Sequence, residues 1–187
     1  MSRSSEFRSR IDDSVLTGMY DYWLARCDDG RLPARRDIDP VELGALLPYV
    51  LLAEYINGGR RVRYRLVGTN MVRRWGLDFT GSCVDEIMTG SYRDFLHELF
   101  FEVAERRCAV LSAGRFRWDV GRALSTRRLF MPLAKDGNRV DMVFIGQTFM
   151  DEIAPAQSIK ISESRPDHVE TLRFIDTDSI AGLRQEL

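Results

Sequence analysis

The sequence predicts an α+β domain in which a five-stranded antiparallel sheet carries helices on one face. Two strand pairs with glycine-containing turns, and one long amphipathic helix between them, indicate this class. The chain has 187 residues, 44% of them apolar, which suffices for one core with terminal extensions. We expect an N-terminal helical extension over residues 1–40, a central domain over residues 41–150 and a C-terminal appendage over residues 151–187.

The N-terminal extension is predicted to be helical from about residue 11. Residues 1–10 are polar, and we expect them to fray. Apolar residues at three- and four-residue spacing over residues 11–25 predict an amphipathic helix. Asp39 and Pro40 predict the cap and the first residue of a short second helix. The apolar side of the first helix includes Met19, Tyr22 and Trp23.

The first predicted hairpin joins residues 49–56 to residues 61–68. A Gly-Gly pair lies between the two runs, and a primed turn needs positive φ at both central positions. With this turn Glu54 lies opposite Arg63, an opposite-charge pair across the ladder. Arginine alternates with apolar residues along the second strand, so we expect the arginines on the outer face. The inner face then carries Val62, Tyr64 and Leu66.

Short helical segments and one long helix follow this hairpin. Residues 71–75 predict a short helix, and a brief turn is predicted at residues 85–88. Ser91, with Asp94 three residues on, predicts the cap of a helix that runs to about residue 110. On the side that faces the sheet this helix carries Phe95 and Leu99.

Three more strands are predicted at residues 115–120, 126–134 and 139–150. Asp136-Gly137 predicts the turn between the last two. Pro132 predicts a bulge or a sheet edge, because a proline donates no hydrogen bond to the ladder. Counted from the turn, one face carries Leu129, Met131, Leu133, Val140, Met142 and Phe144, which we expect to face inward. The other face carries Arg128, Phe130, Pro132, Asp141, Val143 and Ile145.

The appendage after residue 150 is polar and irregular in composition. Apolar residues at Val169, Leu172 and Ile175 predict a short helix after Pro166.

The order of these elements resembles that of the PAS fold, and four short motifs are similar to those of one bacterial, alphaproteobacterial PAS-like family. The motifs are LLPYVLLAEY, RYRLVGT, GLDFTG and, late in the chain, MPL. The resemblance covers about residues 15–150. It implies a stand-alone sensory and regulatory module of signal transduction: a sheet cupped by helices around a small cavity, often dimeric and often tied to a histidine kinase.

The inner face is the predicted ligand site, for a small apolar or aromatic molecule. An apolar set of this kind is more often plain core, which stays open as the alternative. The clustered Tyr and Trp residues, whose donors need partners when buried, are the detail that favours a cavity. The predicted ligand-binding residues are Tyr64, Trp75, Phe95, Leu99, Trp118, Met131 and Phe144. Gly146 and Gln147 would add a small gap and an amide to such a cavity, although we expect Gln147 at the surface or as a cap.

The outer face has two interpretations: a solvated face with one cross-strand ion pair, or, because apolar residues accompany the arginines there, a docking surface. Its natural cover is the N-terminal helix, from the same chain or from a second copy, and we expect a homodimer. The predicted interface residues are Met19, Tyr22, Trp23, Phe130, Val143 and Ile145. RNA binding is not expected there, since Tyr64 faces inward and bases need outward stacking platforms.

Cofactor-binding PAS subtypes provide alternatives. Cys83 lies in GSCVDE, which does not resemble the NCRFLQ motif of flavin–cysteine light sensors. His97 on the long helix keeps a haem-binding redox or gas sensor open as an alternative. Dicarboxylate sensors carry basic residues inside the pocket, whereas we expect Arg63 and Arg65 to point away from it. We therefore predict no cofactor.

A small enzyme is the alternative from another class. Cys83, Asp85, Glu86 and His97 are the sequence's only concentration of catalytic candidates, and no GxSxG, HExxH or phosphate-loop motif occurs. Acidic pairs of this kind commonly mark a helix start. We therefore expect no catalysis, and the tail is too short for a kinase or cyclase domain, so a signal would leave by protein contact.

Composition sets the remaining expectations. A net charge of −1 implies no bulk attraction to nucleic acid or membrane. Three separated cysteines suit buried thiols in a reducing compartment and, with two histidines, offer no local metal site. No apolar run is long enough for a signal peptide or transmembrane helix. We therefore predict a cytoplasmic protein without membrane insertion.

Overall fold

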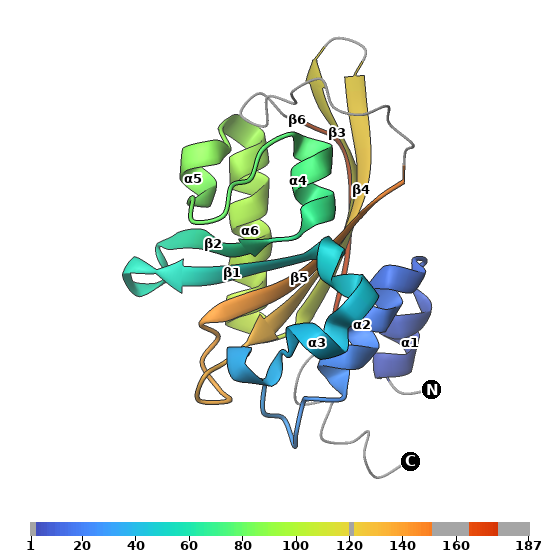
Figure 1. Ribbon diagram of the computed structural model, residues 1–187, viewed down its shortest axis with the longest axis vertical. Helices are drawn as coiled ribbons and strands as arrows, with labels where there is room; N and C mark the ends of the chain where they lie inside the picture. Colours follow the sequence, from blue (N-terminus) through green and yellow to red (C-terminus); the bar gives the residue numbers. More distant parts are fainter. Residues whose placement is uncertain (1–2, 120–121, 151–164, 176–187) are drawn as a thin grey trace.

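The sheet is the element around which the chain is arranged. The computed structural model describes the backbone of residues 3–119, 122–150 and 165–175, and the side chains of residues 4–115 and 125–150. These residues form a six-stranded antiparallel sheet in the order β2-β1-β5-β4-β3-β6 (Figure 1). The strands are β1 Val50–Ile56, β2 Arg61–Val67, β3 Ala109–Asp119, β4 Arg122–Leu133, β5 Met142–Phe149 and β6 Arg165–Ile175.

All five predicted strands are present, which confirms the α+β class and the antiparallel sheet of five strands at its centre. The sixth strand, β6, was not expected, and the short helix predicted after Pro166 is wrong. β6 pairs along the outer edge of β3, from Arg117↔Arg165 to Ala109↔Ile175. The backbone groups at that edge need hydrogen-bond partners, a requirement that outweighs the helix-like spacing of three apolar residues.

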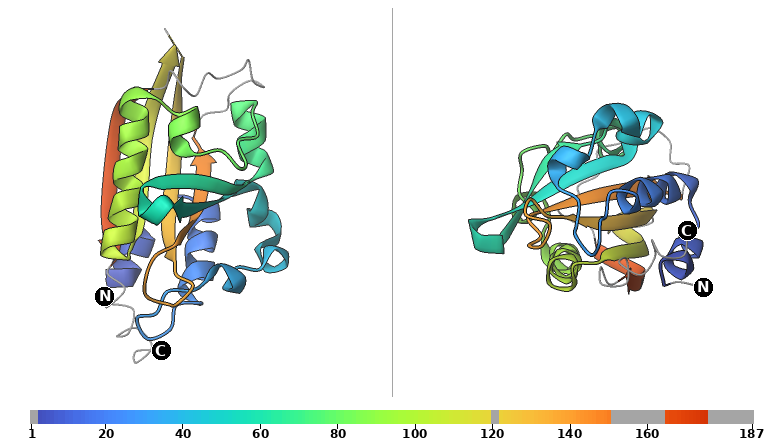
Figure 2. Two further views of the ribbon diagram at one scale, coloured as in Figure 1. Left: turned by 90° about the vertical axis from the view of Figure 1, so that its left-hand side faces the viewer. Right: turned by 90° about the horizontal axis from the view of Figure 1, so that it is seen from below.

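Helices cover both faces of the sheet (Figure 2). α4, α5 and α6 lie on one face, and α1, α2 and α3 lie on the other. The helices are α1 Arg3–Ser9, α2 Ser14–Leu24, α3 Pro40–Leu43, α4 Thr69–Trp75, α5 Val84–Ile87 and α6 Gly90–Arg106.

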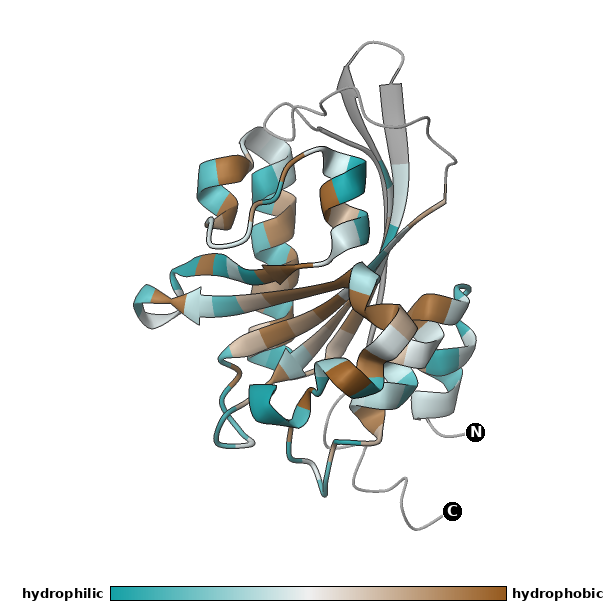
Figure 3. Ribbon diagram, viewed as in Figure 1, coloured by the Kyte–Doolittle hydropathy of each residue, from teal (hydrophilic) through white to brown (hydrophobic). Residues whose placement is uncertain are grey.

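Two apolar cores result, one on each side of the sheet, and apolar residues follow the strands between them (Figure 3). We call them the α6-side core and the α2-side core. The α6-side core includes Tyr64, Trp75, Leu99, Phe130 and Ile145. The α2-side core includes Leu16, Met19, Trp23, Met131 and Phe144.

The N-terminal helices α1 and α2 pack against the sheet of their own chain. Asp13 caps α2, its Oδ1 accepting hydrogen bonds from the amides of residues 15 and 16 at 3.0 Å each. Trp23 is fully buried, and its Nε1 donates to the carbonyl oxygen of Pro132 at 2.9 Å. Residues 3–9, predicted to fray, instead form α1, because Phe7 is buried in the α2-side core.

The hairpin of β4 and β5 groups its residues on two faces as predicted, but a two-residue Asp136-Gly137 turn would pair Leu133 with Val140, whereas Leu133 pairs with Met142. The hairpin also presents the opposite faces to the two cores. Phe130↔Ile145 and Met131↔Phe144 are neighbours, so the same-face groups are confirmed. The inward placement of Met131 and Phe144 is wrong, because Ile145 pairs with Leu51 on β1 and so faces α6. Both faces are apolar, so hydrophobicity could not choose between them.

The hairpin of β1 and β2 confirms the predicted pair Glu54↔Arg63, with Arg63 Nε donating to Glu54 Oε1 at 2.6 Å. The register shifts after Ala53↔Tyr64, so Leu66 pairs with Leu52 and packs against the α2-side core. The inward prediction for Leu66 is therefore wrong, because a bulge reverses the alternation of side chains.

Two further expectations differ in detail. The register runs without a shift through Pro132↔Val143, so of the two predicted alternatives the bulge is wrong and the sheet edge fits. The proline is tolerated because the ladder between β3 and β4 ends at Val110↔Phe130. α6 begins before Ser91, which lies inside the helix and is not its cap, and ends at Arg106 because Arg107 has a positive φ of 51°.

Candidate functional site

A small cavity lies in the α6-side core, between the sheet and the helices α4 and α6. Its volume is about 20 Å³, enough for roughly one water molecule. The apolar part of its wall consists of Leu51, Trp75, Phe79, Met88, Leu96, Phe130 and Ile145. The polar part consists of Tyr64, Tyr92, Arg128 and Gln147.

The polar part of the wall belongs to a row of polar residues across the middle of the sheet. Ser112, Arg128 and Gln147 are direct neighbours on β3, β4 and β5, and Thr126 precedes Arg128 on the same face. The exposed fractions of these residues are 1%, 3%, 5% and 1%. Polar side chains buried to this extent are normally hydrogen-bonded, so this row needs a specific explanation.

Three polar atoms of the row are buried without a hydrogen-bond partner among the described residues. They are Ser112 Oγ, Thr126 Oγ1 and Gln147 Nε2. An unpaired buried polar atom costs roughly 1–3 kcal/mol. Three such atoms on one patch of an otherwise apolar core indicate a site for polar atoms of a bound molecule or of water.

Arg128 brings a fixed positive charge to this row. A guanidinium group stays protonated in proteins, so the charge is present at every physiological pH. Its Nη2 donates to Tyr92 Oη on α6 at 2.5 Å, and Cζ lies 5.5 Å from the centroid of the Tyr92 ring. Burial raises the pKa of both Tyr64 and Tyr92, and the charge of Arg128 opposes this rise. Both phenols are therefore neutral and remain able to donate.

The segment from residue 76 to residue 89, which we call the cover segment, closes one side of the cavity with Phe79 and Met88. Two backbone hydrogen bonds attach it to β2: Tyr64 N donates to Ser82 O at 3.0 Å, and Gly81 N donates to Tyr64 O at 2.7 Å. The Phe79 ring lies 4.9 Å from the Tyr64 ring, measured between centroids. These few contacts attach the cover segment to the edge strand.

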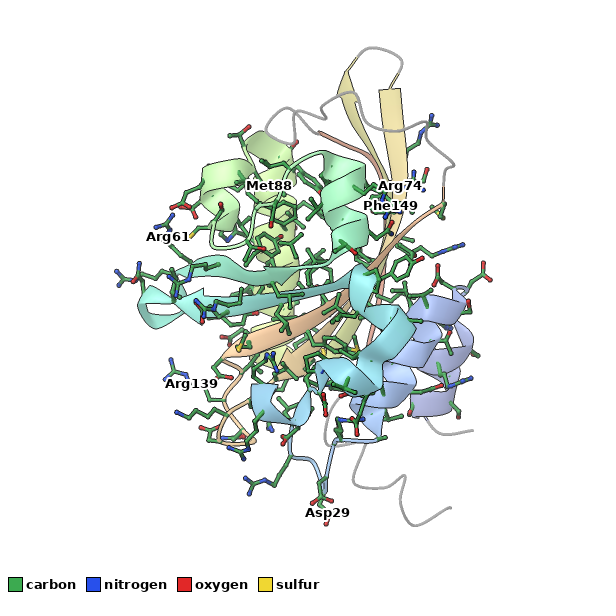
Figure 4. The ribbon with its side chains drawn as sticks, in the orientation of Figure 1. Asp29, Arg61, Arg74, Met88, Arg139 and Phe149 are labelled. Atoms are coloured by element: carbon green, nitrogen blue, oxygen red, sulfur yellow. The ribbon has the colours of Figure 1, made fainter. Side chains whose placement is uncertain are left out.

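An ion-pair cluster ties the cover segment to the outer end of β2 (Figure 4). Arg61 Nη2 lies 2.9 Å from Asp85 Oδ2 and 2.8 Å from Glu86 Oε1. The hydrogen bond from Arg61 lowers the pKa of Asp85, and a backbone hydrogen bond from Cys83 together with Arg61 lowers that of Glu86. All three side chains are partly exposed, so the cluster is screened by water and contributes modestly.

The Arg61→Gln variant should melt slightly lower than the unchanged protein at about pH 7, and this difference should shrink as the pH falls below about 4. The carboxyl pKa values are lowered in the folded state, so the stabilisation is present above their unfolded values and is lost as the pH falls through the folded ones. Thermal melts of both proteins across this range measure it. Arg60→Gln, an exposed neighbour, is the control, and a difference independent of pH would contradict the assignment.

The structure brings only some of the predicted ligand-binding residues to the cavity. Tyr64 and Trp75 line it, whereas Phe95 and Leu99 belong to the same core but not to the cavity wall. Met131 and Phe144 lie in the α2-side core, across the sheet from it. The side chain of Trp118 lies outside the described residues, so its role stays a prediction.

The predicted interface residues are mostly interior. Met19, Trp23, Phe130, Val143 and Ile145 are all at most 2% exposed within the single chain, and only Tyr22 is partly exposed. The assumption that they form an exposed apolar face is wrong, because α2 covers that face and the β4–β5 hairpin turns three of them toward α6. Dimerisation itself stays a prediction.

Arg128 and Gln147 are the site residues that the sequence analysis placed elsewhere. Arg128 was assigned to the outer face and Gln147 to the surface, yet both are buried in the cavity wall. The available signal was their position: each polar side chain interrupts an apolar strand on the face that also carries Phe130 and Ile145.

The catalytic candidates are not arranged for catalysis. Arg61 pairs with both Asp85 and Glu86, and their lowered pKa values oppose a role as proton donor near neutral pH. Burial raises the pKa of Cys83, the opposite of what a nucleophilic thiol requires. Among the described residues, no group of three His, Cys, Asp or Glu side chains could hold a metal ion.

The candidate haem ligand His97 does not line the cavity. It lies instead on a surface groove between α6, the turn of the first hairpin and the loop before β5. This groove has a volume of about 1160 Å³ and includes the exposed side chain of Phe101. His97 and the polar row therefore belong to two separate sites in the fold.

Comparison with known proteins adds to this geometry. A family profile described as PAS domain matches residues 12–147, from the start of the α2 region to the cavity residue Gln147 on β5. The chain belongs to the PAS domain family. No curated protein and no solved structure matches it.

This membership confirms the predicted resemblance to PAS domains. PAS domains are in general sensory and regulatory modules rather than enzymes. The match spans the helices and strands that build the cavity wall. None of the helices in the described part of this PAS chain is both long and apolar enough to cross a bilayer.

Proposed function

We propose that this PAS domain is a sensory and regulatory module of signal transduction that acts by contact with a partner protein, under control of a small molecule in its cavity. The observation that carries the proposal is the polar row inside an apolar core, with Gln147 Nε2 and two hydroxyls buried and facing the cavity side of the sheet. A core without a ligand role would gain stability from apolar residues at these positions.

The size of the cavity couples binding to a conformational change. At about 20 Å³ it holds roughly one water molecule, so a larger molecule must displace part of the wall. The cover segment is the part best able to yield, because Met88 has a flexible side chain and the segment is held to β2 by few hydrogen bonds. A ligand that binds only the displaced arrangement shifts the population toward it.

In this proposal, the surface that changes when the ligand binds is the surface that the partner protein recognises. Movement of the cover segment changes the positions of Arg61, Asp85 and Glu86, which are partly exposed at the edge of the sheet. The partner is a second copy of the chain or another signalling protein such as a histidine kinase. Charged groups at an interface act mainly on partner selection and association rate, which suits regulation by contact.

Native mass spectrometry of the protein purified from its natural source tests the proposal. We expect a mass excess from a retained small molecule, and complexes of two or more chains. The Leu96→Phe variant, which fills the cavity from α6, should lose the mass excess while retaining its circular dichroism spectrum. Bare monomers without a mass excess, both in the unchanged protein and in the variant, would contradict the proposal.

A further inference from the structure

We infer that the cavity recognises the carboxylate group of a small organic acid. The inference rests on the proposed function, because it names the class of molecule that occupies the same cavity. It follows from the chemistry of the polar row: Gln147, Arg128 and two hydroxyl groups.

The groups of the row call for hydrogen-bond acceptors. Gln147 Nε2 is an amide donor that is buried and without an acceptor among the described residues. The hydroxyls of Ser112 and Thr126 can each donate one hydrogen bond, and neither has a partner in the described part of the chain. A carboxylate offers two oxygens that accept and none that donates, so it matches Gln147 and Arg128 in the cavity wall. The two hydroxyls lie next to this pair on the same face of the sheet, outside the wall itself.

Electrostatics favour an anion over a neutral acceptor. Arg128 carries the only charge among the described residues of the cavity wall. Its planar guanidinium matches a carboxylate in shape, and Coulomb attraction is stronger in the interior than in water. Tyr92 fixes the guanidinium through the hydrogen bond to its Oη, so the charge is positioned before a ligand arrives.

The rest of the cavity wall restricts the size and polarity of the group that is attached to the carboxylate. Trp75, Phe79 and Phe130 supply aromatic and apolar contacts, and no second polar patch is found among the described lining residues. The small volume of the cavity also favours a small ligand, since a cavity of about 20 Å³ must open even for a short acid. A monocarboxylate with a small apolar or aromatic body therefore fits better than a dicarboxylate or a phosphate.

A matched panel of ligands tests the inference on the full chain. Acetate, propionate, butyrate and benzoate are compared with acetamide, propionamide, butyramide and benzamide by thermal melting and calorimetry at neutral pH. At least one acid should raise the melting temperature by about 5–10 °C at about one hundred times its Kd, while its amide has no effect. An amide that binds as well as its acid would overturn the carboxylate assignment.

The Gln147→Glu variant locates the binding site. It puts a carboxylate into the row, which pairs with Arg128 and repels an anionic ligand, so the affinity for the acid should fall at least about tenfold. Arg139→Gln is the matched control: it also changes the net charge by one unit but lies exposed, away from the cavity. Equal loss of affinity in both variants, or no loss in Gln147→Glu, would overturn the inference.

A second measurement keeps the test independent of variants that fail to fold. In the unchanged protein, the side-chain amide resonances of Gln147 should shift on titration with the acid that binds. If no acid shifts them, the carboxylate assignment is overturned. A neutral molecule retained in native mass spectrometry would then leave the proposed function standing, whereas the loss of both signals would remove it as well.

Discussion

Replacing Trp23 by alanine should lower the free energy of unfolding by about 4 kcal/mol. The side chain is fully buried in the α2-side core, where Tyr20 lies 6.1 Å from it between ring centroids. Truncation leaves a cavity and removes the hydrogen bond from Nε1 to Pro132 O. Urea unfolding followed by circular dichroism measures the effect, because it does not depend on tryptophan fluorescence.

Two further variants separate the contributions. Trp23→Phe keeps most of the ring but leaves the carbonyl of Pro132 without its donor, at a cost of about 1–3 kcal/mol. Tyr22→Ala changes the adjacent aromatic residue, which is only partly buried, and should cost less than Trp23→Ala. Equal effects of Trp23→Ala and Tyr22→Ala would contradict the placement of α2 on the sheet.

The same variant bears on the predicted dimer. The sequence left open whether the N-terminal helix of the same chain or of a second copy covers the sheet; in the structure α2 of the same chain does, and Met19 and Trp23 are buried there. A dimer that exchanged α2 between copies would have the same buried residues but a melting temperature that depends on protein concentration. Melts of Trp23→Ala and the unchanged protein at several concentrations distinguish the two arrangements.

Local pairing was predictable from the sequence where a tight turn fixes it. The Gly-Gly turn placed Glu54 opposite Arg63, as observed. In the second hairpin the connection is longer than the Asp136-Gly137 pair, so the turn gave the correct faces, with Phe130 and Ile145 together, but a register two residues off. The short helices were likewise predictable from local signals, as Asp39 illustrates by capping α3 through the amide of Val41 at 2.8 Å.

The choice of face was not predictable, because it depends on a partner distant in sequence. Ile145 faces α6 only because β5 lies beside β1, where it pairs with Leu51. An arginine at a strand position is normally solvent-exposed, so Arg128 was assigned to the outside. Its burial depends on Tyr92, 36 residues away, and on the alignment of three strands. Sequence periodicity shows neither which strands are neighbours in the sheet nor which distant residue contacts a given side chain.

Replacing Gly68 by alanine is the second large effect, with an expected loss of about 3 kcal/mol in the free energy of unfolding. A Cβ at this position would lie 2.3 Å from Pro48 O and 2.8 Å from Val50 O. Both are backbone atoms, so no side-chain rotation relieves the clash. The φ of Gly68 is −63°, which any residue can adopt, so the effect is steric rather than conformational.

Gly18→Ala is the matched control for this prediction, because the same substitution should have the opposite sign there. Gly18 lies inside α2, and its added Cβ would make an ordinary contact of 3.5 Å with Leu46 Cδ1. Alanine in a helix interior is favoured over glycine by about 1 kcal/mol, so this variant should be more stable. Urea unfolding compares the two.

The position of Gly68 also links this clash to the proposed ligand. Its amide donates to Val50 O at 2.7 Å, and it caps α4, whose last residue Trp75 lies on the cavity wall. Moving Gly68 away from β1 therefore moves Trp75, so Gly68→Ala should weaken acid binding in the fraction that stays folded. Unchanged stability in Gly68→Ala would mean that the chain at residues 48–50 does not approach residue 68 this closely in solution.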